Sequence, residues 1–297
     1  MIGYGDRSRP LTERERQCIF PHVIAAIDFS AASLGAARWG ITNVAARSDA
    51  IVCHVVPTAL HSADGHGVDH TDAAHRHSES FALLGGLGGF GATLDATSVR
   101  RVVRFGRASH WLSALATESH ADLLILGRRS DANRRGVGEP NVLERSVRRT
   151  EASVLVVPQG TTEPPRHVVA AIDRSAIAHR VLAHARALAK QHACAVTLVH
   201  VVSPTTESYD RARRSSRGRT APSRLEISRG AMAVDGTDLQ LLSGDPPREL
   251  ILHAERNGPA LIVVGKRGAD GAPAESIGSV ARELSTRASS PVLAIGD

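Results

Sequence analysis

The sequence predicts an α/β protein built from two tandem open parallel sheets with helices on both faces. Its 297 residues fit two domains of about 150 residues better than one large domain. Hydrophobic residues make up 42% of the chain but aromatic residues only 3%, so the cores must consist of Ala, Val, Leu and Ile. Such cores suit helices packed on parallel strands.

An internal repeat is the strongest evidence for two copies of one domain. The segment HVIAAIDFS at 22–30 recurs 145 residues later as HVVAAIDRS at 167–175. Three further blocks follow in the same order in both halves: 53–57 with 199–203, 122–127 with 260–265, and 154–157 with 292–295. Each block contains a short apolar run, which is typical of a strand buried on both faces of a parallel sheet.

Weaker strand patterns at 99–104 and 238–243 complete five strands in each half. Ser30 and Ser175 stand where an N-cap would open the first helix of each half. The predicted organisation is therefore an N-terminal tail (1–20), a first domain (21–158), a Pro- and Gly-containing linker (159–165) and a second domain (166–297).

Composition and charge exclude several classes of protein. No stretch approaches the ~20 apolar residues that span a bilayer, and the charged start of the chain is not a secretory signal, so we expect a cytoplasmic protein without a membrane partner. The three cysteines, at 18, 53 and 194, are too dispersed for a disulfide framework or a zinc site. The positive charge comes almost entirely from Arg, leaves a net charge of +6 and accompanies no nucleic-acid-binding motif, so we expect no nucleic-acid partner.

Candidate binding residues gather in the second half. Asp173 closes the first predicted strand and Gly265 the fourth, and in an open parallel sheet ligands bind outside these strand ends. Gly268 and the pair Gly278-Ser279 follow, and the final helix begins with that pair. Glycines let a backbone approach a ligand, and a helix N-terminus favours phosphate. The alternative interpretation is a turn followed by an ordinary helix start.

The spacing Gly265, two residues, Gly268, nine residues, Gly278-Ser279 resembles the nucleotide-binding motif of the universal stress proteins. The resemblance extends over both halves and is that of a tandem-type member. It implies the adenine nucleotide alpha hydrolase-like fold, with strand order 3-2-1-4-5 in each sheet. It also implies a nucleotide-binding set: Ala171, Asp173, Val201, Gly265, Gly268, Gly278, Ser279 and Val280.

Within that set, the resemblance places Asp173 and Gly265 at the ribose and the backbone of Val201 at the adenine. Gly268 and residues 278–280 would receive the phosphates. The implied ligand is ATP, or ADP or AMP, with Mg²⁺ as an accompanying ion. Lys266 and Arg267 are interpreted as solvated neighbours of the loop.

The resemblance implies a regulatory, stress-response protein that binds nucleotide and hydrolyses it slowly at most, because no base or nucleophile is evident beside the loop. The alternatives are an interaction scaffold that binds no nucleotide and a weak ATPase. The family commonly dimerises through its last strand. The expected assemblies are therefore an intrachain pseudo-dimer through 154–157 and 292–295, a homodimer, and a complex with an unidentified protein partner.

The first half departs from the motif at the phosphate positions. It keeps Asp28, Val55 and Gly127, but Ser130 replaces the second glycine and Pro140-Asn141 replaces the Gly-Ser pair. Proline has no N–H to donate, and Ser130 adds a Cβ where close approach is needed. We therefore expect one nucleotide per chain, in the second half. A shifted loop through 136–138 is the alternative.

Two segments that differ between the halves remain. Residues 61–77 mix five His with Asp, a composition that can bind Zn²⁺ or Ni²⁺, but the spacings match no defined site and a solvated loop is favoured. Residues 211–219 form an Arg run that would suit a polyanion, and here too the solvated interpretation is favoured.

Overall fold

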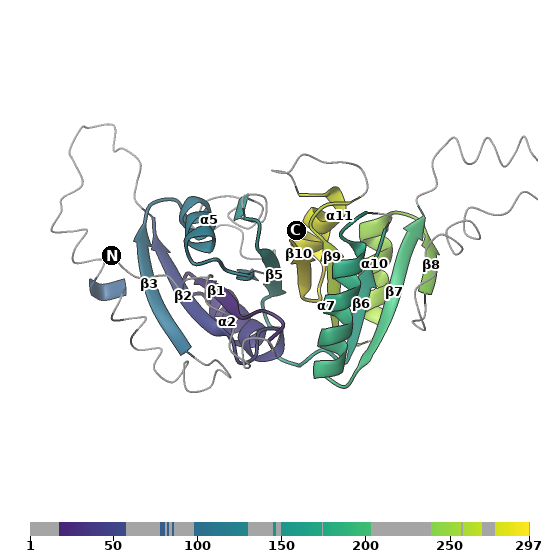
Figure 1. Ribbon diagram of the computed structural model, residues 1–297, viewed down its shortest axis with the longest axis horizontal. Helices are drawn as coiled ribbons and strands as arrows, with labels where there is room; N and C mark the ends of the chain where they lie inside the picture. Colours follow the sequence, from purple (N-terminus) through teal and green to yellow (C-terminus); the bar gives the residue numbers. More distant parts are fainter. Residues whose placement is uncertain are drawn as a thin grey trace, which may run out of the picture. The chain divides into compact units, whose positions relative to one another are not determined.

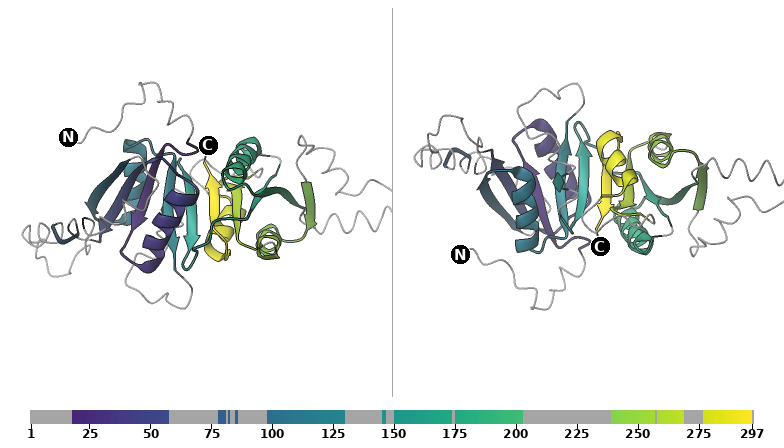
Figure 2. Two further views of the ribbon diagram at one scale, coloured as in Figure 1. Left: turned by 90° about the horizontal axis from the view of Figure 1, so that it is seen from below. Right: turned by 90° about the horizontal axis from the view of Figure 1, so that it is seen from above.

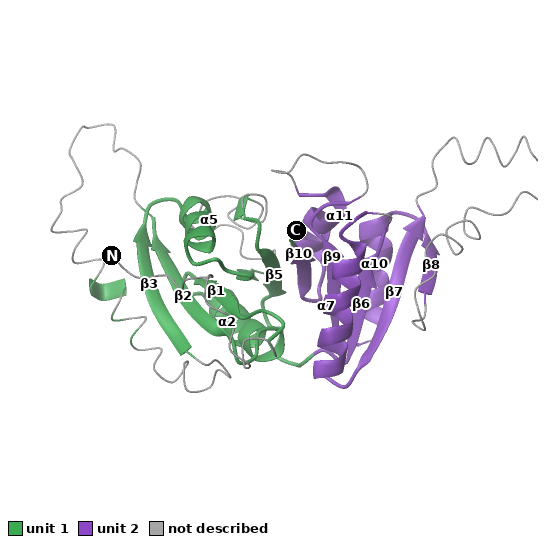
Figure 3. Ribbon diagram, in the orientation of Figure 1, with its two compact units in different colours: residues 1–164, 296–297 green, residues 165–295 purple. Residues whose placement is uncertain are grey.

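The structure is a computed structural model that divides into two compact units, residues 1–164 with 296–297 and residues 165–295 (Figure 3). The described residues are 18–57, 78–80, 82, 85, 98–129, 145–146, 150–173, 175–202, 239–256, 258–268 and 277–296. The segments at 61–77 and 211–219, and Ser130, Pro140 and Asn141, lie outside these residues. Each unit is considered by itself below.

The first unit is an open parallel sheet in the order β3-β2-β1-β4-β5. Its elements are β1 (His22–Ile27), α2 (Ala31–Asn43), β2 (Asp49–Val56), β3 (Ser98–Phe105), α5 (Ala108–Glu118), β4 (Leu123–Arg128) and β5 (Ser153–Pro158) (Figure 1). The order by sequence is third, second, first, fourth and fifth strand, as predicted. Ile24 of β1 and Leu123 and Leu124 of β4 are fully inaccessible to solvent.

The second unit repeats this order as β8-β7-β6-β9-β10. Its elements are β6 (His167–Ala171), α7 (Ala178–Gln191), β7 (Ala195–Val202), β8 (Leu239–Ser243), α10 (Pro246–Arg256), β9 (Ala260–Gly265), α11 (Ser279–Arg287) and β10 (Val292–Ile295). The α/β class, the parallel sheets and the repeat are therefore confirmed.

Helices cover both faces of the second unit's sheet. Successive residues of a strand point to opposite faces, so neighbouring residues of β9 contact different helices. Ile262 and Val264 of β9 belong to a buried cluster with residues of α10 and α11, whereas the adjacent Gly265 faces Ile177 at the start of α7. Figure 2 shows α7 on one side of this sheet and α10 and α11 on the other.

The two predicted N-caps have different outcomes. Ser30 caps α2, and its Oγ accepts a hydrogen bond from the Ser33 backbone N–H at 3.2 Å. The prediction for Ser175 is wrong, because α7 begins at Ala178 with Ile177 at its N-cap. The Ser175 hydroxyl instead donates to the Asp173 carboxylate, which holds the turn after β6.

A close approach between strand and helix recurs at the end of the fourth strand of each unit. A Cβ built at Gly127 would lie 2.5 Å from the Ala32 carbonyl oxygen, in the first turn of α2. At Gly265 it would lie 2.6 Å from Ile177 Cγ2 at the start of α7. Both glycines are therefore required by helix packing, whatever ligand the unit binds.

Two contacts tie the flanks of the first unit to its core. Phe20, which the sequence places in the tail, is only 2% exposed. The Trp39 indole N–H donates to the Glu163 carbonyl at 2.8 Å and so holds the predicted linker against α2. None of the helices that the structure describes is long and apolar enough to cross a membrane.

We expect Gly127→Ala to lower the first unit's free energy of unfolding by about 1–3 kcal/mol, since the new methyl group meets helix backbone that cannot rotate away. Gly35→Ala is the matched control. Gly35 is exposed in α2, and no described atom outside its own helix lies within 4 Å of a Cβ there, so the change should stabilise by about 0.5–1 kcal/mol. Both tryptophans, Trp39 and Trp111, lie in this unit, so urea unfolding followed by tryptophan fluorescence measures it selectively. Equal stability of Gly127→Ala and wild type would contradict the packing requirement.

Candidate functional site

A cavity of about 420 Å³ lies at the carboxyl ends of β6, β7 and β9 in the second unit. Its walls also include the start of α7, the first turns of α10 and α11, and residues 267–268. The volume is within the range of small-molecule binding sites, and the position is where ligands bind in open α/β sheets.

All eight residues predicted to bind nucleotide line this one cavity. They are Ala171, Asp173, Val201, Gly265, Gly268, Gly278, Ser279 and Val280. They come from β6, β7, β9, α11 and the turns beside them, and they span more than 100 residues of sequence, so the fold gathers them. Their contacts with a ligand remain predictions.

Asp173 has its two carboxylate oxygens in different surroundings. Oδ1 accepts hydrogen bonds from the Ser175 backbone N–H, at 2.9 Å, and from the Ser175 hydroxyl. Oδ2 faces Gly268, where a Cβ would come within 3.0 Å of it. The glycine therefore lets the loop after β9 lie against the carboxylate.

The start of α11 supplies the cavity's helix N-terminus. Gly278 is the N-cap, with φ −60° and ψ 148°, and no side chain caps the helix. Its own N–H donates to the Lys266 carbonyl at 2.7 Å. The role of Gly278 is therefore to leave space, because it has no side chain. Ser279 and Val280 occupy the first turn of the helix, where backbone amides have no intrahelical acceptor.

Lys266 and Arg267 differ from each other in a way that the sequence did not indicate. Lys266 is 6% exposed, so its interpretation as a solvated neighbour is wrong. Lys266 directly follows the last residue of β9, Gly265. Arg267 is partly exposed and lines the cavity.

His200 is a cavity residue that sequence reasoning missed. Its Nδ1 lies 2.9 Å from the Ile172 carbonyl oxygen. Because a carbonyl only accepts, Nδ1 carries the proton and Nε2 is the acceptor in the neutral ring. The repeat contained the signal, since His54 makes the same 2.9 Å contact with the Ile27 carbonyl.

The apolar wall was missed as well. Leu250 and Pro246 come from α10, and Ile277 precedes α11. No motif marks them, because they differ from other core residues only in their position at the sheet edge. Together with Val201 they make one side of the cavity hydrophobic.

At the corresponding place in the first unit, an arginine contacts the carboxylate. The Arg129 guanidinium donates to Asp28 Oδ2 at 2.8 Å, and Ser30 donates to Oδ1. Burial raises the pKa of Asp28, but hydrogen bonds from Ser30 and Ser33 and the charge of Arg129 outweigh it and leave the pKa below its ordinary value. This carboxylate is thus held ionised by the chain's own groups.

Metal binding finds no support in the part of the chain that the structure describes. No group of three His, Cys, Asp or Glu side chains there is arranged to hold an ion. Cys53 is buried, which raises the pKa of its thiol to about 12, so this cysteine is not a reactive thiolate.

The chain is similar to known proteins in sequence and in fold. The model of the "Universal stress protein family" matches residues 20–158 and again 165–296. Universal stress protein YxiE of Bacillus subtilis is 34% identical over 73 residues, which are 24% of this chain and 49% of that protein. The match thus spans about half of the curated relative.

Two solved structures share the fold over nearly the whole chain. A universal stress protein from Archaeoglobus fulgidus has a TM-score of 0.63 at 16% identity, covering 93% of this chain and 98% of that one. A putative universal stress protein from Pseudomonas aeruginosa has a TM-score of 0.54 at 14% identity, covering 93% of each. With the family model matching both halves, the repeat and the strand order have one explanation: the chain belongs to the universal stress protein family and carries two of its domains in tandem.

Proposed function

We propose that the second unit binds one adenine nucleotide, ATP or its products ADP or AMP, as the regulatory ligand of a stress-response protein. The observation that carries the proposal is the convergence of all eight predicted residues on one cavity of nucleotide-compatible volume. Family membership supports the stress-response role.

The phosphate end would lie at the glycines and α11. Gly268 and Gly278 leave the loop without side chains, and the amides of Ser279 and Val280 in the first turn are donors for an anion. Arg267 in the cavity wall adds a positive charge nearby. A magnesium ion would arrive on the phosphates, since Mg²⁺ is commonly held by one or two carboxylates plus substrate phosphates.

The nucleoside end would lie between Asp173 and the apolar wall. A carboxylate accepts hydrogen bonds from ribose hydroxyls, and Asp173 Oδ2 is the oxygen that faces the loop rather than Ser175. The backbone of Val201 borders the hydrophobic side with Leu250 and Ile277, a surrounding suited to a purine ring.

We infer binding and regulation rather than turnover. Among the described cavity residues, the two groups with the chemistry of a general base are Asp173 and His200. Asp173 Oδ1 is engaged by Ser175, and the His200 ring is fixed by the Ile172 carbonyl. Asp173 therefore serves best as a positioning group. His200 keeps Nε2 as an acceptor, but it adjoins Val201 at the proposed nucleoside end rather than the glycines at the phosphate end, so any hydrolysis would be slow.

Asp173→Ala should weaken ATP binding by about tenfold or more, because a hydrogen bond to a charged group contributes about 1.5–3 kcal/mol. Asp28→Ala is the matched control: it removes the equivalent carboxylate from the first unit and should leave affinity unchanged. Titration calorimetry measures both variants and the stoichiometry, which we expect to be one. Two equivalent sites, or equal losses in the two variants, would refute the proposal.

Gly268→Ala should also reduce ATP affinity about tenfold or more, since its methyl group would come within 3.0 Å of Asp173 Oδ2 and push loop and carboxylate apart. The rest of the unit should remain folded, because among the described residues beyond its chain neighbours that carboxylate oxygen is the one atom within 4 Å of the new group. Circular dichroism checks the fold alongside the titration. Undiminished affinity in a folded Gly268→Ala protein would remove Gly268 from the site.

A further inference from the structure

A pair of buried histidines lies in the second unit, away from the cavity. His167 opens β6 at the end opposite to Ala171, and His253 lies on α10. Their ring centroids are 6.1 Å apart, and the residues are 8% and 9% exposed. His167 Nε2 lies 2.9 Å from the Thr197 hydroxyl, while its Nδ1 is buried with no hydrogen-bond partner among the described residues.

The first unit lacks this pair. α5 and α10 each follow the third strand of their unit after a two-residue turn that begins with Gly. When these two turns are aligned, Leu115 occupies the place of His253. Leu115 is completely buried, as a core position requires. His22 occupies the place of His167 in β1, so one histidine is shared and the second belongs to this unit alone.

The surroundings of the pair oppose a positive charge. Burial lowers the pKa of His167, and the nearby His253 lowers it further. Burial likewise lowers the pKa of His253, with Arg256 adding to the effect. A proton on either ring would therefore be costly while α10 stays packed on β6.

The other charged groups on neighbouring elements do not offset this cost. α11 carries Arg282, Arg287 and Glu283, and Glu283 is paired with Arg287. On α10, Glu255 accepts from the Ser289 hydroxyl at 2.8 Å, and Glu249 lies against Gly244. The remaining charged or titratable groups on these elements are Arg248 of α10 and His200 at the cavity end of β7; β8 and β9 carry none.

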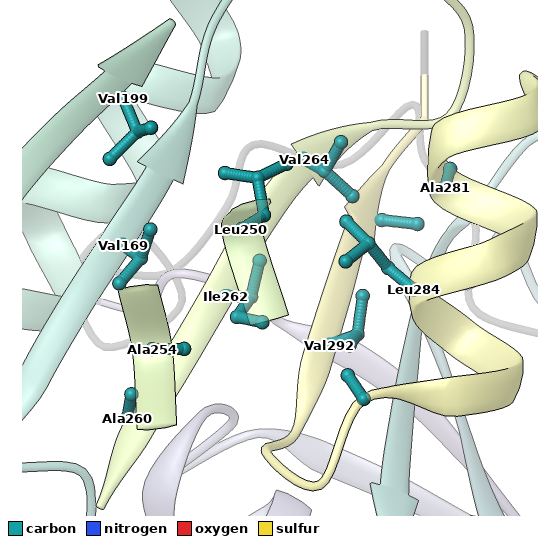
Figure 4. Packing of buried hydrophobic residues seen from close by; sticks show 12 residues of the cluster. Val169, Val199, Leu250, Ala254, Ala260, Ile262, Val264, Ala281, Leu284 and Val292 are labelled. Atoms are coloured by element: carbon teal, nitrogen blue, oxygen red, sulfur yellow. The ribbon is translucent and has the colours of Figure 1, made fainter. Parts of the chain in front are cut away.

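The elements that carry the pair also form walls of the cavity. Ala171 of β6 and Leu250 of α10 line it. Between pair and cavity, Val169 packs with Leu250 and Ala254 in one buried cluster (Figure 4). Separating α10 from β6 to hydrate a charged imidazole would therefore displace a cavity wall.

From this juxtaposition we propose that the His167–His253 pair makes the second unit proton-sensitive, so that protonation loosens α10 from β6 and releases the nucleotide. The release of nucleotide rests on the proposed nucleotide site, whereas the pH dependence of the second unit's stability does not. The sign follows from linkage. An unfolded chain binds protons below about pH 6.5, whereas the folded pair resists them, so stability is full above that pH and falls as the pH drops through it.

The test compares full-length wild type with His253→Leu, which installs the residue that the first unit uses, and with His179→Leu, which removes an exposed histidine of the same unit. Unfolding is followed by calorimetry at pH 7.5 and 5.5, with tryptophan fluorescence recorded in parallel. The calorimetric transition that causes no fluorescence change belongs to the second unit. Each histidine can shift its unfolded-to-folded ratio by up to about tenfold per pH unit. We expect His253→Leu to lose much of this dependence and His179→Leu to keep it. Equal dependence in all three proteins would overturn the proposal.

Two further measurements complete the test. Histidine ring NMR shifts of wild type report both pKa values directly, and values at or above 6.5 for the pair would overturn the proposal even if His253→Leu did not fold. ATP titration should show affinity falling about tenfold more in wild type than in His253→Leu between pH 7.5 and 5.5, the triphosphate's own titration being common to both. An equal fall would overturn the coupling. Absence of ATP binding at pH 7.5 in wild type would instead overturn the proposed function, and the coupling with it, while leaving the unfolding comparison intact.

Discussion

The close contact between the end of the fourth strand and the helix that follows the first strand is the constraint on which both units depend. Gly127 meets the backbone of α2 and Gly265 meets Ile177 at the start of α7, at distances that exclude a Cβ. This contact fixes where each helix begins, and with it the turn that carries Asp28 or Asp173. The first glycine of the nucleotide motif is thus a packing residue in both copies. That explains its presence in the first unit, where the glycines at the two later motif positions are replaced.

Beyond that shared contact the two copies differ in the loop after the fourth strand. In the first unit Arg129 pairs with Asp28, and the next residue in the sequence is Ser130. In the second unit Arg267 stands at the position of Arg129 and lines the cavity. Gly268 stands at the position of Ser130 and lies against Asp173 Oδ2. The difference arises from a few positions in one loop, while the sheets keep the same strand order. If the second unit alone binds nucleotide, loop composition rather than architecture sets the binding capacity of this fold.

The sequence predicts the fold well because the repeat aligns eight strands independently of any motif, and the strands are too apolar to be surface segments. The sequence also predicts that the polar site residues lie close together, because the ends of parallel strands meet at one edge of the sheet. It does not predict the role of Ser175, since Asp-x-Ser fits both an N-cap and a carboxylate turn. Nor does it predict that Lys266 is buried, because charge normally signals exposure. His200 and the wall residues Leu250 and Ile277 escape because their types are ordinary in strands and helices, and only tertiary position gives them a role.

The cavity of the second unit has a consequence for the behaviour of the whole chain. A folded unit that takes up a ligand gains stability in proportion to the logarithm of ligand concentration, whereas a unit that binds none does not. If the second unit alone binds nucleotide, the chain joins one domain of fixed stability to one whose stability follows the cellular nucleotide supply. Depletion of nucleotide would then expose one half to unfolding and proteolysis while the other persisted, so the lifetime of the protein would itself be a readout of energy status.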